Sequence, residues 1–554
     1  MKKVIITMFL LCTSLIFAQL PDGYVSEQLI DTYNSPMDVE FITGRPDMMV
    51  IAERAGKIWI ADLVNDNWVK RDNPVIDITN QVTTYFERGI QSIIVDRHFI
   101  YVYYTVEETY LLPGLNEDVN DDSATINRVS RWEISWPQNI EFGEEILIGK
   151  TPSDGIPSTA GNHQGGGMAW GENNMLFVST GDGGSGIFNQ QAIDRGIMRA
   201  ELNVNGGSKS QIINCLNGKL LRINPWNGDG ANGNPFYDSN NRRTPESRVY
   251  ALGFRNPFDI VGKPYMGVNN QPTTIYVADV GEGNKEEVTL IDKAGLNAGW
   301  GLREGFSTRT LSGNNPDEGV PYSDLMSEAT SFVEVSDDTQ RRFTHHPPEL
   351  DYGHSGNPLT RLPRFTDGVL DPIIDVNAIE GNSITGGAYI SGDGFGENYN
   401  GAYIFSDYSR GWLNIGIPYV DQSNDRYFDY IEEFAPINSY PVTIDITQNP
   451  IDGSIYIVTL FGDIHRISLS ETLSIQTPSL NDEIKIIYDN NTNLNSIVGI
   501  NNMATLKIYD SLGRFISEDT IYDYHIIDYK LQSGIYIAHI INDSNILVKK
   551  FIIK

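Results

Sequence analysis

A single histidine followed by three glycines is the stretch of this chain whose residue types best suit proton-transfer chemistry. His163 precedes Gly165–Gly167, and an apolar segment, Leu176–Ser179, then leads into the sequence Gly-Asp-Gly-Gly at 181–184. An imidazole exchanges a proton near neutral pH, and glycine lets a ligand approach the backbone closely. Taken alone, such a short motif is more often a core histidine beside a hairpin turn than a catalytic base.

The segments around this histidine match one known family in several places. The sequence NHQGGGMAWGENNMLFVSTGDGG at 162–184 resembles a segment of the glucose/sorbosone dehydrogenase family, which contains soluble quinoprotein sugar dehydrogenases and hedgehog-interacting-protein-like relatives. Six further segments occur in the family's order, so the resemblance covers about four fifths of the chain, from residue 25 to 468. They are Met49–Ile58, Glu87–Ile90, Tyr101–Thr105, Ala251–Pro257, Asp279–Glu282 and Ala298–Gly305.

The pattern of apolar residues predicts an all-β protein. Short runs rich in Val, Ile, Tyr, Phe and Trp alternate with Gly, Asn, Asp and Pro, as in strands joined by turns. Six such strands, each followed by a polar turn and a partner strand, centre near Val50, Val102, Phe177, Tyr276, Tyr403 and Tyr456. Their irregular spacing indicates a propeller only weakly, but together with the resemblance it predicts a six-bladed β-propeller over residues 19–469. Three insertions are predicted to be loops rather than blade strands: Tyr110–Thr125, Asn224–Arg243 and Ser307–Asp371.

The net charge excludes some classes of partner. The chain has 554 residues and a formal net charge of −32. Nucleic acids and anionic membrane surfaces are bound through basic patches, so neither is an expected partner. We interpret the acidity as a solvated surface that keeps the protein soluble.

The N-terminus has the features of a secretory signal over residues 1–18. Lys2 and Lys3 precede the apolar run Val4–Phe17, and Ala18 offers a small residue before the cleavage point. No other run is long and apolar enough to span a membrane, so we expect no transmembrane segment in the mature protein. Cleavage would leave Cys215 as the only cysteine, and no intrachain disulfide could form.

The composition changes near Ser470, where residues 470–480 are predicted to be a polar linker. Residues 481–554 then form a compact β pattern that resembles the C-terminal sorting domain of the type IX secretion system. Three segments carry this resemblance: Thr505–Arg514, Leu531–Ile537 and Val548–Lys554. It implies export through the periplasm to the medium or the cell surface, with the type IX machinery as a partner. The alternative is a small carbohydrate-binding β-sandwich, but the linker and the final Lys-rich strand, which suits a sheet edge protected by lysine, favour the sorting domain.

The family resemblance assigns a role to each matched residue. His163 matches the histidine that takes a proton from the anomeric hydroxyl of a sugar while hydride passes to pyrroloquinoline quinone (PQQ). Asn162 stands where members have Asp or Asn; with an amide there, His163 loses one possible ionic partner, so a neighbour is expected to raise its pKa less. Arg255 and Asn256 match the pair that contacts the quinone oxygens, although Arg255 could instead pin a loop between blades. Glu87 matches a cofactor-side polar residue, or else is a turn carboxylate that caps the next strand.

A calcium site is also implied by the resemblance. Gly281 and Glu282 match the segment whose main-chain carbonyls hold Ca²⁺ beneath the quinone, where the ion would act as a Lewis acid. The surrounding pattern, with Glu286 and Glu287, is closer to the hedgehog-interacting-protein-like branch.

One cofactor-binding feature of the soluble glucose enzymes is missing from the sequence. Their last blade carries two arginines that clamp the cofactor, whereas Ser439–Asp445 contains no Arg or Lys. Arg410, the nearest cationic match, is not expected to replace them.

Two functions follow from these observations. The first is a secreted, calcium-dependent quinoprotein that oxidises an aldose or related sugar and passes electrons to an external acceptor. The second is a non-catalytic propeller that binds glycan or protein through the same face. His345, His346 and His354 are interpreted as loop residues rather than zinc ligands, because adjacent histidines before two prolines cannot share one helical face.

Overall fold

The computed structural model describes most of the chain between residue 20 and residue 553. The described residues are 20–30, 33–42, 45–65, 67–96, 98–115, 123–134, 143–263, 274–308, 344–366, 369–370, 372–419, 427–470, 485–489, 494–498, 504–510, 514–521, 525–527, 531, 533–542 and 545–553. The predicted signal at 1–18 and the linker after Ser470 lie outside them. Within this part of the chain, strands dominate and the longest helices, α2 (Asn189–Asp194) and α3 (Gly206–Gln211), have six residues each. No described helix has the length and apolar character needed to cross a membrane.

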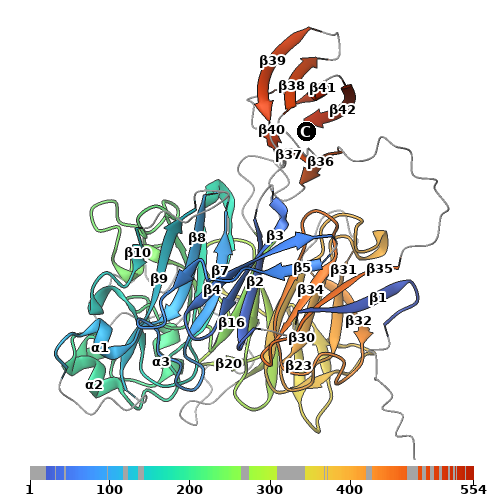
Figure 1. Ribbon diagram of the computed structural model, residues 1–554. Coiled ribbons are helices and arrows are strands. Elements are labelled where there is room, and N and C mark those ends of the chain that lie inside the picture. The colour runs from blue at the N-terminus through green and yellow to red at the C-terminus, as the bar shows by residue number, and fades with distance from the viewer. Residues whose placement is uncertain are drawn as a thin grey trace, which may run out of the picture.

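Six sheets, here called blades one to six, succeed one another from Tyr24 to Leu469 (Figure 1). Each has four antiparallel main strands, and short parallel strands extend blades three and four. Blade one contains β2 (Pro36–Ile42), β3 (Arg45–Glu53), β4 (Lys57–Val64) and β5 (Asn67–Lys70), with β6 (Ile76–Asp77) beside β4. Blade two contains β7 (Ile90–Val95), β8 (Phe99–Thr105), β9 (Thr125–Glu133) and β10 (Glu145–Ile148), with β11 (Ile156–Ser158) beside β9. Blade three contains β12 (Gly165–Trp170), β13 (Leu176–Thr180), β14 (Lys219–Ile223) and β15 (Val249–Leu252), extended by β19 (Leu296–Asn297) and β22 (Thr344–His345).

The other three blades complete the circle. Blade four contains β16 (Pro257–Gly262), β17 (Ile275–Asp279), β18 (Lys285–Ile291) and β23 (Leu350–His354), extended by β24 (Thr360–Leu362), β27 (Ile373–Ile374) and β28 (Glu380–Gly381). Blade five contains β29 (Ile384–Tyr389), β30 (Tyr403–Asp407), β31 (Leu413–Pro418) and β32 (Phe428–Ala435). Blade six contains β33 (Thr443–Gln448), β34 (Ile455–Thr459), β35 (Ile464–Leu469) and the N-terminal strand β1 (Tyr24–Ile30).

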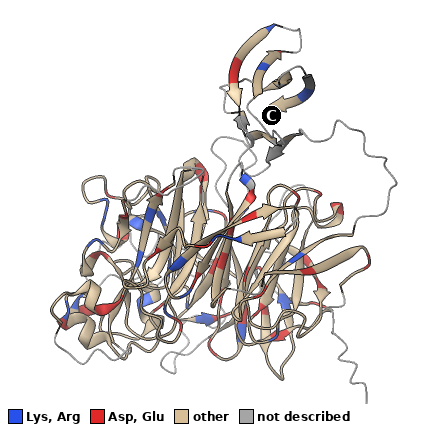
Figure 2. Cartoon of the chain, in the orientation of Figure 1, with Lys and Arg blue, Asp and Glu red and all other residues tan. Residues whose placement is uncertain are grey.

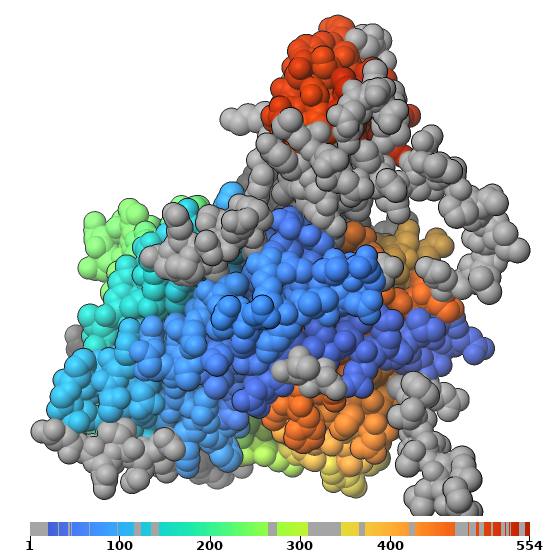
Figure 3. Space-filling model, viewed as in Figure 1, coloured from blue at the N-terminus to red at the C-terminus, as the bar shows by residue number. Residues whose placement is uncertain are grey.

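The blades close into a ring in two ways. Each innermost strand contacts the innermost strand of the next blade, in the order β2, β7, β12, β16, β29 and β33, and β33 contacts β2 again. Strand β1 also pairs with β35 from Tyr24 opposite Leu469 to Ile30 opposite Ile464, so the first and last strands share one sheet. Figures 1 and 3 show this blue N-terminal strand against the orange C-terminal strands. The prediction of a six-bladed β-propeller is confirmed.

The six strand centres predicted from the sequence each fall on the second strand of a different blade. These strands are β3, β8, β13, β17, β30 and β34. Each lies inside its sheet with a neighbouring blade on either face, so its residues are apolar without alternation, as in the buried run of β13. The innermost strands carry a weaker apolar signal because they contain Gly, Asp, Ser and Thr.

The predicted loop at Ser307–Asp371 is wrong in part. Leu350–His354 form β23, the fourth strand of blade four, and Thr360–Leu362 form β24 beside it. Residues 309–343 lie outside the described part of the chain. The predicted loop at Asn224–Arg243 contains no strand.

A register shift near the start of every innermost strand determines how neighbouring blades meet. The shifts follow Pro36, Ile90, Gly165, Pro257, Ile384 and Thr443. In three blades the residue after the shift is an aspartate whose carboxylate accepts an N–H from the next blade. Asp445 accepts from Val39 at 3.2 Å, Asp38 from Ile93 at 2.7 Å, and Asp259 from Gly387 at 3.3 Å. These contacts satisfy donors on sheet edges that have no strand partner at the centre of the ring.

The carboxylates of the innermost strands have raised pKa values. Burial, and next the charge of Glu40, raise the pKa of Asp38 well above its ordinary value. Burial and neighbouring carboxylates raise the pKa of Glu40 and Asp445 in the same way, and burial raises the pKa of Asp259 to about 7. The folded protein therefore binds protons here that the unfolded chain releases, so stability falls as the pH rises from about 4 to about 7.

The described residues from Lys485 to Ile553 form a separate pair of sheets. One contains β36 (Lys485–Asp489), β37 (Leu494–Val498) and β40 (His525–Ile527). The other contains β39 (Phe515–Ile521), β38 (Ala504–Asp510), β41 (Gly534–Asn542) and β42 (Asn545–Ile553), in that order. Ile497 and Ile527 from the first sheet share one apolar core with Leu506, Ala538 and Ile540 from the second. The predicted β-sandwich is confirmed, and β42, with its two lysines, is an edge strand as expected (Figure 2).

We expect Asp259→Asn to flatten the pH dependence of folding stability. The substitution removes a carboxyl whose pKa rises from 3.8 to about 7 on folding. That shift corresponds to a contribution on the order of 4 kcal/mol at most. Melting temperatures at pH 5, 6, 7 and 8 should therefore improve for the variant relative to the wild type as the pH rises. The exposed Asp393→Asn is the matched control, and parallel curves for Asp259→Asn and wild type would contradict the prediction.

Candidate functional site

The predicted site residues gather at one end of the ring, on blades two, three and four. Glu87 lies just before β7, His163 just before β12, and Arg255 and Asn256 just before β16. In each blade the second strand ends opposite the start of the innermost strand: Thr180 pairs with Gly165, and Asp279 with Pro257. The turns that follow β13 and β17 therefore meet the segments that enter β12 and β16.

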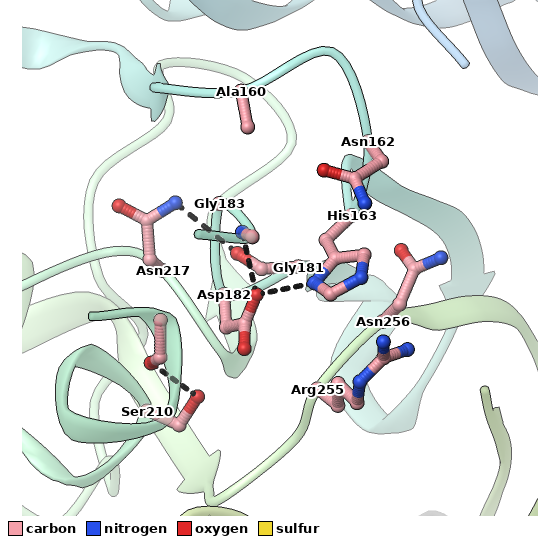
Figure 4. Close-up of polar contacts among 12 residues, drawn as sticks. Ala160, Asn162, His163, Gly181, Asp182, Gly183, Ser210, Asn217, Arg255 and Asn256 are labelled. Carbon is pink, nitrogen blue, oxygen red and sulfur yellow. Dashed lines mark hydrogen bonds and ion pairs between the residues drawn. The ribbon is translucent and has the colours of Figure 1, made fainter. Parts of the chain in front are cut away.

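His163 is oriented by Asp182 (Figure 4). Its Nδ1–H donates to Oδ1 of Asp182 at 2.7 Å, which leaves Nε2 as the ring nitrogen for a ligand. The other oxygen of Asp182 accepts from Nε1 of Trp300 at 2.8 Å, and Gly184 N donates to Oδ1 at 2.7 Å. Burial would raise the pKa of Asp182, but the charge and hydrogen bond of His163, with Arg255 and Trp300, hold it below its ordinary value.

The ionic partner of His163 comes from another part of the chain. The partner is not the preceding residue, Asn162, but Asp182, nineteen positions along the chain. Asn162 lies beside the turn that follows β13, where its Oδ1 would be 2.5 Å from a Cβ at Gly184. The Gly-Asp-Gly-Gly sequence was the signal for this aspartate, but only the folded strand end brings it to the imidazole.

The glycines around His163 permit a tight crossing of two segments. His163 has a φ of +57°, which is uncommon for a residue with a side chain. A Cβ at Gly181 would lie 2.0 Å from the carbonyl oxygen of His163, and one at Gly165 would lie 2.5 Å from Gly181 N. The motif is therefore glycine-rich because the histidine loop rests directly on the end of β13.

Glu87 holds the histidine loop from the neighbouring blade. Its Oε2 accepts the backbone N–H of His163 at 2.7 Å, and its own N–H donates to Gly161 O at 3.0 Å. Burial raises the pKa of Glu87, opposed by the charges of His163, Arg255 and Arg54. Its carboxylate thus caps the segment before β12, in another blade, instead of the strand that follows it in sequence.

Arg255 and Asn256 are fixed through their backbone by Asp279. Both N–H groups donate to the Asp279 carboxylate, at 2.7 to 3.1 Å, and burial raises the pKa of Asp279 to about 7. The guanidinium of Arg255 donates through Nη1 to Val280 O at 2.9 Å and lies 5.4 Å from the ring centre of Trp300. Its Nε is buried and has no hydrogen-bond acceptor among the described residues. Oδ1 of Asn256 accepts from Gly165 N at 2.9 Å, which ties blade four to blade three.

The acidic residue after the second strand of blade three, Asp182, has a different role from the acids that end the second strands of blades one, four and five. Glu53 and Asp407, like Asp279, end the second strand of a blade and accept N–H groups from the segment that enters its innermost strand. In blade three the equivalent residue is Thr180, and the acid lies two positions later, at Asp182. That displacement frees one carboxylate to bind an imidazole.

The turn with Gly281 and Glu282 is folded around Glu304. Oε1 of Glu304 accepts N–H groups from all four residues of 282–285 at 2.9 to 3.2 Å. A Cβ at Gly281 would lie 1.6 Å from Lys285 O, so only glycine fits there. Within the described ranges, no three His, Cys, Asp or Glu side chains converge as a metal site. Main-chain carbonyls are among the ligands that Ca²⁺ accepts.

Two arginines, Arg410 and Arg54, are each engaged in contacts within the protein. Arg410 pairs with Glu380. Arg54, to which sequence reasoning assigned no role, donates through Nε to Arg88 O at 2.8 Å and through Nη2 to Thr84 O at 2.7 Å. Burial lowers the pKa of Arg54, opposed by the nearby Glu87.

The three histidines near residue 350 lie in strands or beside them. His345 is in β22 and His354 in β23, so the expectation that both are loop residues is wrong. Nε2 of His354 pairs with Oε1 of the buried Glu286 at 2.8 Å, and this hydrogen bond raises the pKa of His354. His346 lies 3.9 Å from Glu349 instead, so these histidines face different carboxylates.

Comparison with known proteins gives matches over both parts of the chain. Residues 33–323 match the glucose/sorbosone dehydrogenase family, and residues 478–554 match the secretion system C-terminal sorting domain. The HIPL2 protein of Arabidopsis thaliana is 25% identical over 485 residues, which covers 77% of this chain and 59% of that protein. The HIPL1 protein of the same plant is 31% identical over 175 residues, 29% of this chain and 22% of that protein. This chain therefore spans less than two thirds of either relative.

A solved structure is similar over most of the chain. It is the PQQ-bound form of the aldose sugar dehydrogenase from Streptomyces coelicolor, at 16% identity and a TM-score of 0.47. The similarity covers 81% of this chain and 99% of that one. Because the family match extends over more than half of the residues and includes those around His163, Arg255 and Gly281, this protein belongs to the glucose/sorbosone dehydrogenase family.

Proposed function

We propose that this protein is an exported quinoprotein that oxidises an aldose or a related sugar, with His163 as general base. The observation that carries the proposal is the pairing of His163 with the buried carboxylate of Asp182 at 2.7 Å, next to Arg255. A base must be held in one tautomer, and a carboxylate at Nδ1 leaves Nε2 able to accept a proton. The family to which the chain belongs supports the same reaction class.

The residues around His163 fit PQQ in part. Arg255 has a buried Nε without an acceptor, and a planar cofactor with several carboxylates would supply one. We propose that Arg255 and Asn256 contact its quinone side, that Glu87 and Asn162 border it, and that carbonyls of Gly281 and Glu282 hold Ca²⁺. When bound, PQQ supplies the hydride acceptor.

The chain's own residues then handle the proton. Nε2 of His163 takes the proton of the sugar's anomeric hydroxyl, and Asp182 stabilises the imidazolium that forms. The hydrogen bond from Trp300 keeps the Asp182 carboxylate ionised and in place. Electrons leave afterwards to an external acceptor.

The alternative is a non-catalytic propeller that binds glycan or protein at the same face. The segment 439–445 favours it, because it offers no cation and its Asp445 is committed to the backbone of Val39. Two missing charge-assisted contacts would weaken cofactor binding by about 1.5 to 3 kcal/mol each. Reconstitution of the protein with PQQ and Ca²⁺, followed by dye reduction with a panel of sugars, separates the two functions.

In that assay, we expect His163→Ala to lower turnover at least about 100-fold with the fold intact, as judged by circular dichroism. The turnover of Asp182→Asn should lie between the turnovers of His163→Ala and the wild type. The imidazole keeps a hydrogen-bond partner, but the imidazolium loses its countercharge. His98→Ala is the control, since His98 is exposed. Unchanged turnover in His163→Ala would show that His163 is not the general base.

We expect Ca²⁺ to raise the melting temperature, because an ion bound only by the folded turn stabilises the folded state. Chelation should lower the melting temperature, and added Ca²⁺ should restore it. Scanning calorimetry in EDTA, Ca²⁺ and Mg²⁺ measures the effect. A melting curve that is the same in all three conditions would contradict the calcium assignment.

The sorting domain leads us to propose export by the type IX machinery, with delivery to the medium or the cell surface. Truncation after Ser470 should leave the propeller folded, because its ring closes between β1 and β35 without the later residues. In the native host we expect the truncated protein to remain in the periplasm. Fractionation and circular dichroism test both parts; normal export or an unfolded propeller would refute the proposal.

A further inference from the structure

We propose that Phe86 is a platform on which a pyranose ring stacks beside His163. This inference rests on the proposed function, because it assigns part of the substrate's binding to a residue outside the family's matched set. A pyranose presents a face of C–H groups, and such a face loses contact with water when it stacks on an aromatic ring.

Phe86 lies next to the segment that carries His163. The adjacent residue, Glu87, binds the backbone N–H of His163. A Cβ at Gly161, two residues before His163, would lie 3.0 Å from Cβ of Phe86 and 2.8 Å from the ring of Tyr85. The Cβ of Phe86 therefore packs against the loop that carries His163.

The ring of Phe86 contributes little to the core. Phe86 is 66% exposed, whereas the side chain of His163 beside it is only 11% exposed. Tyr85 is its aromatic neighbour, with ring centres 6.4 Å apart. A large apolar side chain left in water gains no stability from burial, so folding alone does not explain a phenylalanine here.

The backbone of Phe86 is also strained. Its φ is +54°, a conformation that suits glycine or asparagine and is an outlier for a bulky residue. Strain of this kind persists where surrounding contacts enforce it, and it clusters at ligand sites. His163, with φ of +57°, is the other strained residue of this site, and the carboxylate of Glu87 links the two.

The contacts that enforce this backbone come from blade one. Nη2 of Arg54 donates to the carbonyl oxygens of Thr84 and Phe86, and Nε donates to Arg88 O at 2.8 Å. The carbonyls before and after the aromatic residue are thereby clamped by a single guanidinium. The backbone that carries the ring is thereby held in one conformation, which limits where the exposed ring can lie.

The test compares Phe86→Asn with wild type and with Phe461→Asn. Asparagine tolerates the left-handed backbone and removes the ring. Phe461 is 78% exposed and lies in the turn between β34 and β35, and its φ is not in the left-handed region. Reconstituted proteins are assayed with D-glucose, D-xylose and cellobiose, and sugar contact is followed separately by saturation-transfer NMR without turnover.

We expect Phe86→Asn to raise KM at least fivefold, to leave kcat within twofold, and to weaken saturation transfer to the sugar C–H protons. Its melting temperature should equal or exceed that of the wild type, because strain is relieved. Phe86→Tyr keeps an aromatic ring and should have the KM of the wild type. Phe461→Asn should also have the KM and the saturation transfer of the wild type.

An unchanged KM and saturation transfer in Phe86→Asn, with an active wild type, would overturn this inference and leave the proposed function standing. A lower melting temperature in Phe86→Asn would also overturn it, because the ring would then support the fold. A wild type that neither contacts nor oxidises any of the sugars would overturn both.

Discussion

The inner edge of each blade is the constraint from which the rest of the propeller follows. An innermost strand has a sheet partner on one side only, and its other edge carries N–H groups that must be satisfied at the centre of the ring. Asp38, Asp259 and Asp445 supply acceptors across the blade boundaries. Elsewhere Ser92 donates to Gly166 O at 2.5 Å, Gly167 lets the backbone of Ile260 approach, and Gly386 leaves room for the side chain of Asp259. Each of these contacts depends on the register shift at the start of the strand.

The same shift positions the chemistry. It turns the segment before each innermost strand toward the end of the second strand, where blades one, four and five place an acid that binds its N–H groups. Blade three moves that acid by two residues and presents Asp182 to His163. Glu87 from blade two and Asn256 from blade four then hold the histidine segment from both sides. Three blades thus cooperate to orient one imidazole.

Stability and function are opposed at this end of the molecule. His163 and Phe86 occupy left-handed backbone, Asp279 is a buried carboxyl with a pKa of about 7, and Arg255 keeps a buried donor without an acceptor. Each of these features destabilises the free protein. The apolar second strands of the surrounding blades and the seam between β1 and β35 offset them. These destabilising features lie together at the candidate site, where a bound ligand would remove some of them.

The sequence by itself determined the class of fold and the second strand of every blade, and it indicated His163, Glu87, Arg255 and Gly281 as candidate site residues. Apolar runs and short motifs are local signals, so they can be identified from the sequence without knowledge of the fold. Only the tertiary structure decided that Asp182 is the partner of His163, that Glu87 caps another blade, and that Leu350–His354 complete blade four. These contacts join residues separated by nineteen, seventy-six and about sixty positions, and no local pattern encodes such pairs. They exist because closure of the ring brings the ends of separate strands to one face.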